Sequence, residues 1–449
     1  MIKKVLIANR GEIALRVART CRELGIATVA AHSSADRDSA VVAFADESVQ
    51  IGPGPSRESY LNIPAVIEAA RIRGADAVHP GYGFLSENAD FAEVCAAEGL
   101  TFIGPPPEVM ARLGDKAVAR RIMAEAGLPL LPGSRDTPDQ PEAAAAVAAE
   151  IGYPVIIKAA AGGGGRGMTV VHDADAFARA YRHTRATAQA VFGDGRLYVE
   201  RYLPSARHVE VQVLADTHGN AVHLGARDCS LQRRHQKLVE ETPAPGLPAE
   251  VVEPLCAAAV RGTLASGYVG AGTFEFLVDP QGRFYFMEVN CRLQVEHPVT
   301  EMVTGLDLVA EQIRVAAGEP LGFTQADVDA RGVSIECRIN AENPRRDFAP
   351  APGTLEEFAA PAGPFVRVDT HARPGYRIPA YYDSLLAKVV VWAPDRPRAL
   401  ARMRRALEEL HADGPGVVTT TEFLRGLLDH PRFVAAEHDT VMIETLTSQ

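Results

Sequence analysis

Short apolar runs alternate with amphipathic stretches along the first hundred or so residues. The predicted elements, in chain order, are strand Val5–Ala8, helix Glu12–Leu24, strand Thr28–Ala31, helix Ala65–Arg73, strand Asp76–His79, helix Phe91–Glu98 and strand Thr101–Ile103. Strands separated by helices of this length indicate a parallel, doubly wound sheet. The strand ends of such a sheet form natural ligand crevices.

Gly104-Pro105-Pro106-Pro107 is a stiff break, and we place the first domain boundary shortly after it, near Gly114. Two helices are predicted first, Lys116–Ala126 and Glu142–Glu150. Mostly strands of alternating polarity follow: Val155–Ala159, Met168–Val171, Tyr198–Arg201, His208–Leu214, Ala221–Asp228, Gly272–Val278 and Phe284–Asn290. A second proline-rich stretch opens a last part with strands Val366–Thr370 and Leu386–Trp392 and a basic helix Arg396–Leu410. The patterning predicts a mixed α/β protein.

Composition narrows the class of protein. The 449 residues suggest about three domains, and the 47% apolar and 23% charged contents are those of a soluble globular enzyme. The net charge of −11 argues against a nucleic-acid partner. With no long apolar segment and no signal-like N-terminus, we expect a cytoplasmic protein without a membrane partner. The six scattered cysteines favour reduced thiols over disulfides or a zinc site.

Two apolar-aromatic runs around Pro280-Gln281-Gly282 predict a β-hairpin. A turn centred between Gln281 and Gly282 places Glu275 opposite Glu288, and Asn290 then shares the face of Glu288. Like charges that oppose each other repel unless a cation lies between them. Two carboxylates and an amide oxygen therefore predict a magnesium or manganese site, with phosphate oxygens completing the coordination.

Polar residues continue to alternate with apolar ones beyond this hairpin. We expect the strand to extend through Arg292 and Gln294 to Glu296. Arg292 offers a planar fork for a small oxyanion, and Glu296 is a candidate base. A half-solvated edge strand is the alternative, but such strands favour Thr, Lys and Ser over this mixture.

Residues 162–167 form a glycine-rich run between two predicted strands. It matches G-x-G-x-x-G only weakly, because the dinucleotide motif has to open a helix. We interpret it as a hairpin tip acting as a lid, with backbone N–H groups that fold over phosphates and Lys158 directed at the same charges. An ordinary loose hairpin is the alternative, although consecutive glycines lose much entropy on ordering.

Four further residues have weaker signals when taken alone. Lys116 fits an ordinary surface lysine, and Arg338 fits a solvated strand residue. His208 and His235 fit structural histidines, which is what isolated histidines usually are.

Six blocks of sequence, in a fixed order, resemble biotin carboxylase, a family of the ATP-grasp superfamily. They are Lys3–Ala14, His79–Asn88, Lys158–Met168, Arg227–Lys237, Glu288–Thr300 and Tyr381–Ser384. The resemblance implies a Rossmann-like N-terminal domain (1–113), an ATP-grasp core (114–330) with a mobile glycine-rich lid at about 131–203, and a mixed α/β C-terminal domain (331–449).

The resemblance also implies a reaction, in which ATP phosphorylates bicarbonate to carboxyphosphate and the carboxyl group passes to N1 of biotin. Residues implied to contact ATP are Lys116, Lys158, Gly163, Gly164, Gly165, Gly167, Glu200, Leu203, His208, Gln232 and His235. Those implied to hold two Mg²⁺ or Mn²⁺ ions are Glu275, Glu288 and Asn290. Those implied to bind bicarbonate are Lys237, Arg292, Gln294, Val295 and Glu296.

Catalysis and biotin binding complete the implied roles. Glu296 resembles the base that deprotonates bicarbonate, and Arg338 the group that stabilises the biotin enolate; Lys237 and Arg292 are also implied to be catalytic. Tyr82 is implied to lie near the biotin ring. These roles replace the structural interpretations of Lys116 and Arg338.

The chain shows no Met-Lys-Met biotinylation motif, so we expect biotin to arrive on a separate carrier protein. Carboxyltransferase subunits would use the product, as in acetyl-CoA or acyl-CoA carboxylase; a piece of a longer carboxylase is the alternative. The family's homodimer contacts match Arg16, Arg19 and Glu23. The sequence departs from the family at Cys291, which should face away from the site, at Thr420, in C-terminal packing, and at Arg201, which replaces the lysine of some relatives.

Two other functions remain open at this point. Another ATP-grasp ligase would join a carboxylate to an amine and ignore biotin. A non-catalytic nucleotide-binding scaffold is disfavoured, because the chain keeps Glu288, Glu296 and Arg338.

Overall fold

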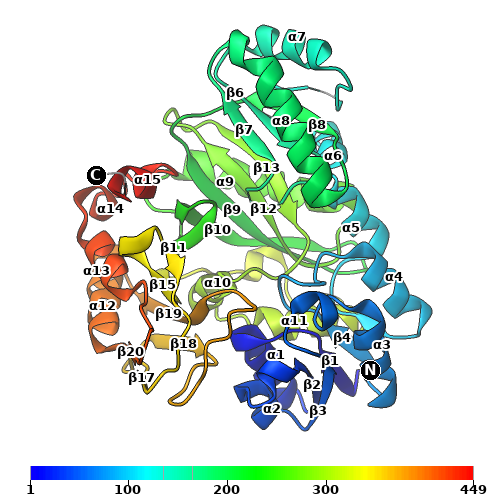
Figure 1. The fold of residues 1–449 in the computed structure, drawn as a ribbon, viewed down its shortest axis with the longest axis vertical. Coiled ribbons are helices and arrows are strands. Elements are labelled where there is room, and N and C mark those ends of the chain that lie inside the picture. The colour runs from blue at the N-terminus through cyan, green and yellow to red at the C-terminus, as the bar shows by residue number, and fades with distance from the viewer. Residues whose placement is uncertain (1, 135, 164, 448–449) are drawn as a thin grey trace.

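The computed structural model describes residues 2–134, 136–163 and 165–447, arranged around sheets of five, eight and three strands (Figure 1). The five-stranded sheet lies near the N-terminus, the eight-stranded sheet crosses the middle of the molecule, and the three-stranded sheet projects from it with two helices (Figure 1). Two further sheets have two strands each. The mixed α/β class predicted from the sequence is confirmed.

The N-terminal sheet is parallel, with strand order β3-β2-β1-β4-β5. Its strands are β1 (Lys4–Ile7), β2 (Ala27–Ser33), β3 (Glu47–Gly52), β4 (Ala77–His79) and β5 (Thr101–Phe102). Its helices are α1 (Gly11–Glu23), α2 (Ala40–Phe44), α3 (Ile63–Ile72) and α4 (Ala89–Ala97). The strand order reverses between β1 and β4, which makes the carboxyl ends of these two strands a ligand crevice.

Local chemistry explains where the helices of this sheet begin. The side chains of Asn62 and Asn88 accept hydrogen bonds from the backbone N–H groups of Ala65 and Phe91, which caps α3 and α4. The sequence did not predict β3, because this edge strand is largely half-buried and lacks a continuous apolar run.

The central sheet has strand order β13-β12-β9-β10-β11-β14-β19-β18 and is antiparallel. Its strands are β9 (Arg207–Ala215), β10 (Ala221–Arg233), β11 (Gln236–Thr242), β12 (Gly270–Val278), β13 (Phe284–Asn290), β14 (Val333–Asn340), β18 (Val366–Thr370) and β19 (Leu385–Ala393). Because β11 pairs with β14, one sheet continues across the boundary predicted at residue 330.

The three-stranded sheet has order β7-β6-β8 and its own hydrophobic core. It consists of β6 (Val155–Ala159), β7 (Met168–Val171) and β8 (Leu197–Arg201), packed against α7 (Pro141–Ile151) and α8 (Ala174–Phe192). Since β6 and β7 pair antiparallel, the glycine-rich run joins them as the predicted hairpin.

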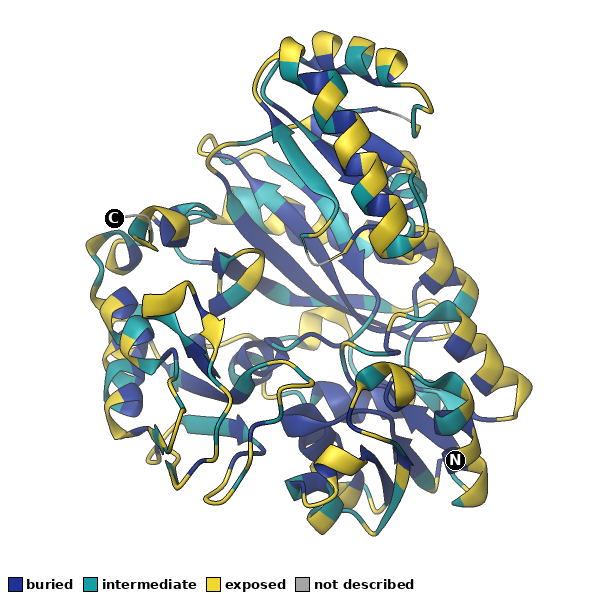
Figure 2. Cartoon of the chain, in the orientation of Figure 1, coloured by how far each residue is buried: buried dark blue, intermediate teal, exposed yellow. Residues whose placement is uncertain are grey.

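Most of the other helices pack on the central sheet, with buried inner faces and exposed outer faces (Figure 2). They are α5 (Pro107–Gly114), α6 (Lys116–Glu125), α9 (Ala249–Ser266), α10 (His297–Thr304), α11 (Leu308–Ala316), α12 (Arg396–Glu409), α13 (Thr421–Asp429), α14 (Pro431–Val434) and α15 (Met442–Thr447). The small strands are β15 (Glu342–Asn343), β16 (Ala349–Pro350), β17 (Glu357–Ala359) and β20 (His411–Asp413). Among the described residues, no helix is both long and apolar enough to span a membrane.

The sequence interpretation of residues 198–290 as mostly strands missed α9. This helix contains Pro254, which interrupts a helical pattern in the sequence. The structure tolerates the proline because Leu255, Cys256, Ala258 and Ala259 are buried in the core beneath β9 and β12.

The predicted extension of the second hairpin strand to Glu296 is wrong. Strand β13 ends at Asn290, residues 291–296 form no regular element, and α10 begins at His297 with Pro298 in its first turn. The reason lies in the packing: Cys291 belongs to the core under β12 and β13, whereas Leu293 packs in the core of the N-terminal sheet. Between Cys291 and Leu293 the backbone therefore passes from the hydrophobic core of the central sheet to that of the N-terminal sheet.

The predicted opposition of Glu275 and Glu288 is confirmed, but the turn between their strands is not centred as expected. Val278 pairs with Phe284 and Phe276 with Phe286, which centres the turn on Gln281. A β-bulge after Glu275 then restores its pairing with Glu288.

Close packing at Gly262 in α9 generates a stability prediction. A Cβ atom at this position would lie 2.6 Å from Cε1 of Phe274 and 2.8 Å from Sδ of Met123. Alanine in a helix is favoured over glycine by about 0.5–1 kcal/mol, but overpacking costs about 1–3 kcal/mol. We therefore expect Gly262→Ala to lower the thermal unfolding midpoint.

Gly426 in α13 is the matched control. A Cβ atom added at this glycine would meet no heavy atom of the described residues within 4 Å beyond its own helix backbone. Gly426→Ala should raise the midpoint or leave it unchanged. A stabilising Gly262→Ala would show that the core relaxes around the added methyl group.

Candidate active site

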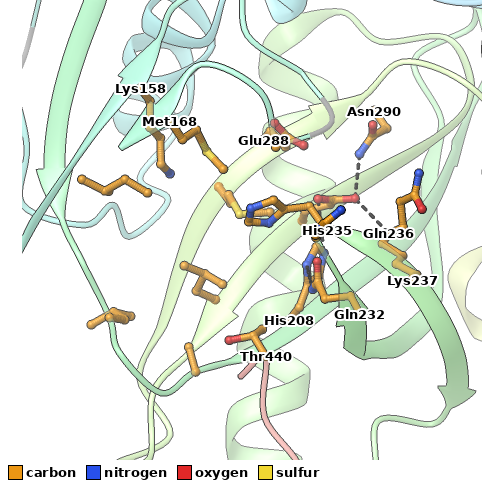
Figure 3. A pocket seen from close by; sticks show the side chains of 18 of the residues that line it. Lys158, Met168, His208, Gln232, His235, Gln236, Lys237, Glu288, Asn290 and Thr440 are labelled. Atoms are coloured by element: carbon orange, nitrogen blue, oxygen red, sulfur yellow. Dashed lines mark hydrogen bonds and ion pairs between the residues drawn. The ribbon is translucent and has the colours of Figure 1, made fainter. Parts of the chain in front are cut away.

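A cavity of about 380 Å³ lies between the three-stranded sheet, the central sheet and the C-terminal segment. Figure 3 shows Lys158 and Met168 on one side of it, His208, Gln232 and His235 together on another, and Thr440 at the C-terminal edge. The predicted site residues that line it are Lys116, Lys158, Gly165, Leu203, His208, Gln232, His235, Lys237, Glu275, Glu288, Asn290, Arg292, Gln294, Val295, Glu296 and Arg338. Residues far apart in the sequence, from Lys116 to Arg338, thus meet in one space.

Four predicted residues are absent from this lining, and a fifth, Gly164, lies outside the described residues. Gly163 and Gly167 belong to the connection between β6 and β7 but do not line the cavity. Glu200 is buried behind the cavity, where it forms ion pairs with Arg120 and with Lys158, the latter at 2.6 Å. Tyr82 lines a second cavity instead.

The Lys237 ammonium group lies among three carboxylates in this site. It lies 2.5 Å from Glu210, 3.1 Å from Glu275 and 2.6 Å from Glu296. Burial alone would lower the pKa of Lys237, but these three carboxylates raise it well above the ordinary value. Lys237 is therefore a permanent cation.

The carboxylates around Lys237 are held ionised in turn. Burial raises the pKa of Glu275, but Lys237 and His208 outweigh it and hold that pKa well below the ordinary range. Lys237, Arg338 and Arg227 likewise hold the pKa of Glu296 below its ordinary value against the effect of burial. Glu296 is thus an ionised carboxylate next to two cations.

Glu275, Glu288 and Asn290 form a cluster of oxygen ligands at the hairpin. Asn290 Nδ2 donates to Glu275 Oε1 at 2.8 Å, a bond drawn as the dashed line from Asn290 in Figure 3. Glu288 forms an ion pair with Lys116. Two carboxylates and an amide oxygen are the hard donors that Mg²⁺ and Mn²⁺ prefer. The donor set therefore fits such an ion, and Lys116 marks a position where the carboxylate charge already attracts a cation.

Arg292 and Gln294 are each oriented by one neighbour that lines the cavity and one that does not. Arg292 Nε lies 2.8 Å from Glu87 Oε2, and its Nη2 donates to Asn290 Oδ1 at 3.1 Å. Gln294 donates to Glu275 at 2.9 Å and accepts from Arg227 at 2.9 Å. The side chains that follow β13 are thus positioned by hydrogen bonds rather than by a strand.

Arg338 is not the solvated strand residue that its sequence context allows. On β14, its Nη2 atom lies 2.9 Å from Glu296 Oε2 and its Nε atom 2.6 Å from Glu240 Oε1. Burial raises the pKa of Glu240 to about 7, although Arg338 acts to lower it. Arg338 therefore lies between two buried carboxyl groups.

His208 and His235 also depart from the structural role that is usual for isolated histidines. His208 Nε2 lies 3.2 Å from Glu275 Oε2, and this carboxylate raises the pKa of His208 against the lowering by burial. His235 has a left-handed backbone (φ 64°) in the β10–β11 turn, and burial lowers its pKa. A Cβ atom on Gly165 would overlap the His235 ring, so only glycine permits this approach of the hairpin tip.

Several site residues escaped the sequence analysis. Apolar lining residues form a slot that includes Leu131, Ile156, Met168, Tyr202, Leu277, Met287 and Val441. In sequence these resemble ordinary core positions. Glu210 and Arg227, which are fully buried and 2.7 Å apart, were also missed. Glu210 has the signal of a charge between two apolar residues, Val209 and Val211, whereas Arg227 is followed by Asp228 and lacks that signal.

The second cavity, of about 480 Å³, lies at the carboxyl ends of β1 and β4, where the strand order reverses. Its lining includes Tyr82 from the N-terminal part and Tyr381 from the C-terminal part. Both cavities are lined by Gln236, Lys237, Val295 and Arg338. The two spaces therefore meet at the cluster of charges. Cys291 packs in the core and lines neither of them within the described chain, as predicted.

Three family models match the chain in succession. Residues 1–110 match "Biotin carboxylase, N-terminal domain", residues 115–324 match "Carbamoyl-phosphate synthase L chain, ATP binding domain", and residues 336–445 match "Biotin carboxylase C-terminal domain".

Full-length relatives are similar to the chain throughout. Biotin carboxylase 1 of Bacillus subtilis is 52% identical over 99% of both chains, and biotin carboxylase of Pseudomonas aeruginosa is 55% identical over 96% of both. A biotin carboxylase–ATP-type complex from Campylobacter jejuni superposes with a TM-score of 0.97 at 49% identity over 99% of both chains. The biotin carboxylase domain dimer of Hydrogenobacter thermophilus 2-oxoglutarate carboxylase, with MgADP, ADP and bicarbonate, gives 0.96 at 47% identity over 99% of this chain and 98% of that one.

The charges around Lys237 generate a pH-dependent prediction. A carboxyl group whose pKa falls on folding adds stability above its unfolded pKa of about 4.3 and loses it as the pH decreases. Lys237→Met leaves three buried carboxylates without their shared cation, and we expect it to cost about 3–5 kcal/mol at pH 8. In the variant these carboxyls bind protons more readily, so the deficit relative to wild type should shrink towards pH 5.5.

Thermal unfolding midpoints at pH 8 and pH 5.5 check this prediction. Lys3→Met, at an exposed lysine, is the control and should change neither midpoint by much. A Lys237→Met deficit that grows as the pH falls would contradict the assigned charge balance.

Proposed function

The chain belongs to the biotin carboxylase family, and on that premise we propose that it carboxylates biotin on a separate carrier protein, using ATP and bicarbonate. The observation that carries the proposal is the meeting of the two cavities at Lys237, Val295 and Arg338. One space has the cations and apolar slot suited to a nucleotide, and the other opens beside it at the N-terminal crevice. The reaction is the first half-reaction of an acetyl-CoA or acyl-CoA carboxylase.

ATP is proposed to occupy the first cavity. Its base fits the apolar slot beside Leu203, with Gln232 and His235 at the polar edge. Lys116 and Lys158 supply the positive charge that a triphosphate requires, and Glu200 orients Lys158 through their ion pair. The backbone N–H groups of the glycine hairpin, from Gly163 to Gly167, are proposed to close over the phosphates.

Mg²⁺ or Mn²⁺, two ions in our proposal, would be held by Glu275, Glu288 and Asn290. Such ions neutralise phosphate charge and orient the γ-phosphoryl group. His208, which already interacts with Glu275, fixes one of these carboxylates from behind.

Bicarbonate is proposed to lie between Arg292, Lys237, Gln294 and the Val295 backbone. Arg292 offers a bidentate grip, and Lys237 supplies a charge that cannot titrate near neutral pH. Glu296, ionised for the reasons given above, is suited to accept the bicarbonate proton. A bicarbonate oxygen then bonds to the γ-phosphorus as the bond to ADP breaks, which produces carboxyphosphate.

Biotin is proposed to enter through the second cavity, next to Tyr82. Its N1 atom gains the carboxyl carbon as the carbon–oxygen bond to phosphate breaks and the N1 proton leaves. Arg338, whose guanidinium faces both cavities, is placed to stabilise the enolate oxygen that develops on biotin. Because carboxyphosphate reacts readily with water, the reaction requires that solvent be excluded, which is the role proposed for the lid.

Domain organisation and partners complete the proposal. We divide the chain at 1–113, 114–330 and 331–449, with a lid at about 131–203 that is supported by the separate core of β6–β8. Carrier and carboxyltransferase are separate partners, and two copies form a dimer through α1. Arg19 and Glu23 are exposed there, whereas Arg16 is engaged within the chain by Glu301 and Asp307.

A cytoplasmic location agrees with the cysteines. None of the six, all of which lie in the described part of the chain, forms a disulfide, and all are buried. Unpaired cysteines are typical of a reducing compartment.

Bicarbonate-dependent ATP hydrolysis, measured with and without free biotin, tests the proposed function. We expect biotin to stimulate turnover and ¹⁴C from bicarbonate to appear on biotin. Arg338→Ala should lower biotin carboxylation by about 100- to 1000-fold, with ATP binding retained because Arg338 is not among the residues proposed to contact ATP. Arg398→Ala, at a surface arginine with 69% of its side chain exposed, is the control.

Turnover that ignores biotin would refute the proposal. If it depended on an amine instead, the chain would be another kind of ATP-grasp ligase. Biotin carboxylation by Arg338→Ala at the wild-type rate would remove the role given to that residue.

A further inference from the structure

Lys388 on β19 is a charged residue that neither cavity explains. Its side chain is fully buried, and it is absent from the lining of both cavities in the described structure. A lysine is almost never buried without partners. The Nζ atom of Lys388 lies 3.1 Å from Glu12 Oε1 and 3.8 Å from Asp369 Oδ2, and it donates a hydrogen bond to the Val295 carbonyl oxygen at 2.8 Å.

The sheet places Lys388 directly opposite Arg338. These residues are register partners in the β14–β19 ladder, so their side chains leave the same face with Cβ atoms about 5 Å apart. Two cations in this arrangement repel each other unless each has its own anion. Arg338 is paired with Glu240 and Glu296, whereas Lys388 is paired with Glu12 and Asp369.

The two opposed cations hold two consecutive residues of the chain. Lys388 fixes the carbonyl oxygen of Val295, and Arg338 fixes the carboxylate of Glu296. This segment forms no regular element after β13, so its position depends on such side-chain contacts. Hydrogen bonds from charged donors are shorter and stronger than those between neutral groups, so these two contacts favour one position of the short segment.

Glu12 extends the same contact to the second cavity. The Tyr82 hydroxyl donates to Glu12 Oε1, which is the oxygen atom that Lys388 contacts. Nζ of Lys388 also lies 6.0 Å from the centre of the Tyr82 ring. One ammonium group therefore joins a wall of the second cavity, through Glu12 and Tyr82, to the Val295–Glu296 segment that both cavities share.

We propose that Lys388 is a positioning residue for carboxyl transfer, which holds the Val295–Glu296 segment and Tyr82 at a fixed separation. The inference rests on the proposed function, since it assigns bicarbonate to one side of Lys388 and biotin to the other. Lys388 contacts no substrate. It keeps the carbonyl group of Val295 directed towards Nζ. The other groups of the Val295–Glu296 segment then face the first cavity in one arrangement.

Removal of Lys388 should separate the kinetic constants. A displacement of about 1 Å between reacting groups can cost roughly 100-fold in rate. We therefore expect Lys388→Met to lower the biotin-dependent kcat by about 100-fold and to raise the KM for bicarbonate by about tenfold. The KM for ATP should stay within about threefold, because none of its proposed contacts comes from β19 or from the Val295–Glu296 segment.

Loss of stability alone could mimic part of this effect, because Lys388→Met leaves Glu12 buried without its cation. Three further variants separate the explanations. Glu12→Gln alone is the reference for the double variant. Lys388→Met/Glu12→Gln removes the ammonium group and the carboxylate charge of residue 12 together, while the Val295 carbonyl oxygen still lacks its hydrogen-bond donor. Arg396→Met removes another largely buried ion pair, with Glu241 at 2.8 Å, which shares no residue with the contacts of Lys388.

The experiment measures kcat, the KM values for ATP, bicarbonate and biotin, and the thermal unfolding midpoint of the wild-type chain and of each variant. The proposal requires the double variant to recover stability relative to Lys388→Met but to keep the lowered kcat and raised bicarbonate KM. It also requires Arg396→Met, at a similar loss of stability, to leave both constants near the wild-type values. If Lys388→Met does not fold, the proposal is tested by comparing kcat and the bicarbonate KM of the double variant with those of Glu12→Gln.

Three results would overturn the proposal: wild-type constants in Lys388→Met, recovery of activity together with stability in the double variant, or an equal catalytic loss in Arg396→Met. Failure of the proposed function is distinguishable, because the wild-type enzyme would then hydrolyse ATP without responding to biotin. The bicarbonate KM of the variants would still decide whether Lys388 positions the Val295–Glu296 segment.

Discussion

Neutralisation of buried charge is the constraint on which this site depends. A charge in a protein interior is costly unless an opposite charge and hydrogen bonds accompany it. Lys237 meets this requirement with Glu210, Glu275 and Glu296, and Arg338 meets it with Glu240 and Glu296. Glu296 therefore belongs to both sets, and its charge is set by the cations on either side of it.

The central sheet makes this balance possible because it delivers the charges from neighbouring strands. Glu210 is on β9, Glu275 on β12, Lys237 and Glu240 on β11, and Arg338 on β14. Antiparallel neighbours bring side chains on one face to within about 5 Å. Since the sheet continues from the middle of the chain into its last third, the nucleotide-sized cavity and the groups at the second cavity share one rigid support. The segment that follows β13 is the exception, and it is held by side chains instead.

Much of the fold and part of the site could be predicted from the sequence. The period-two pattern of the hairpin predicted which residues of each strand share a face, but the pairing of Glu275 with Glu288 also depends on a β-bulge after Glu275 that the pattern does not reveal. The same pattern failed beyond Asn290, since alternation cannot reveal that Leu293 packs into a different core from Cys291. Helix α9 was missed because Pro254 interrupts its pattern.

Other parts of the site required more than local patterns. Lys116, His208 and Arg338 are isolated residues whose partners lie far away in sequence, so only the family resemblance pointed to them. Glu210, Arg227 and Lys388 were not identified at all. Each is a buried charge within a strand, and its meaning depends on partners that only the tertiary structure brings into contact.

The central claim is that the site joins bicarbonate to the γ-phosphoryl group of ATP before biotin is carboxylated. Oxygen-18 transfer tests it most directly. With [¹⁸O]bicarbonate, ATP and biotin in unlabelled water, the account predicts that one ¹⁸O atom appears in each inorganic phosphate released, because the oxygen that bonds to phosphorus stays there when carboxyphosphate breaks down. Phosphate that carries only oxygen from water would contradict it, since the ATP would then have been hydrolysed without bicarbonate as the nucleophile.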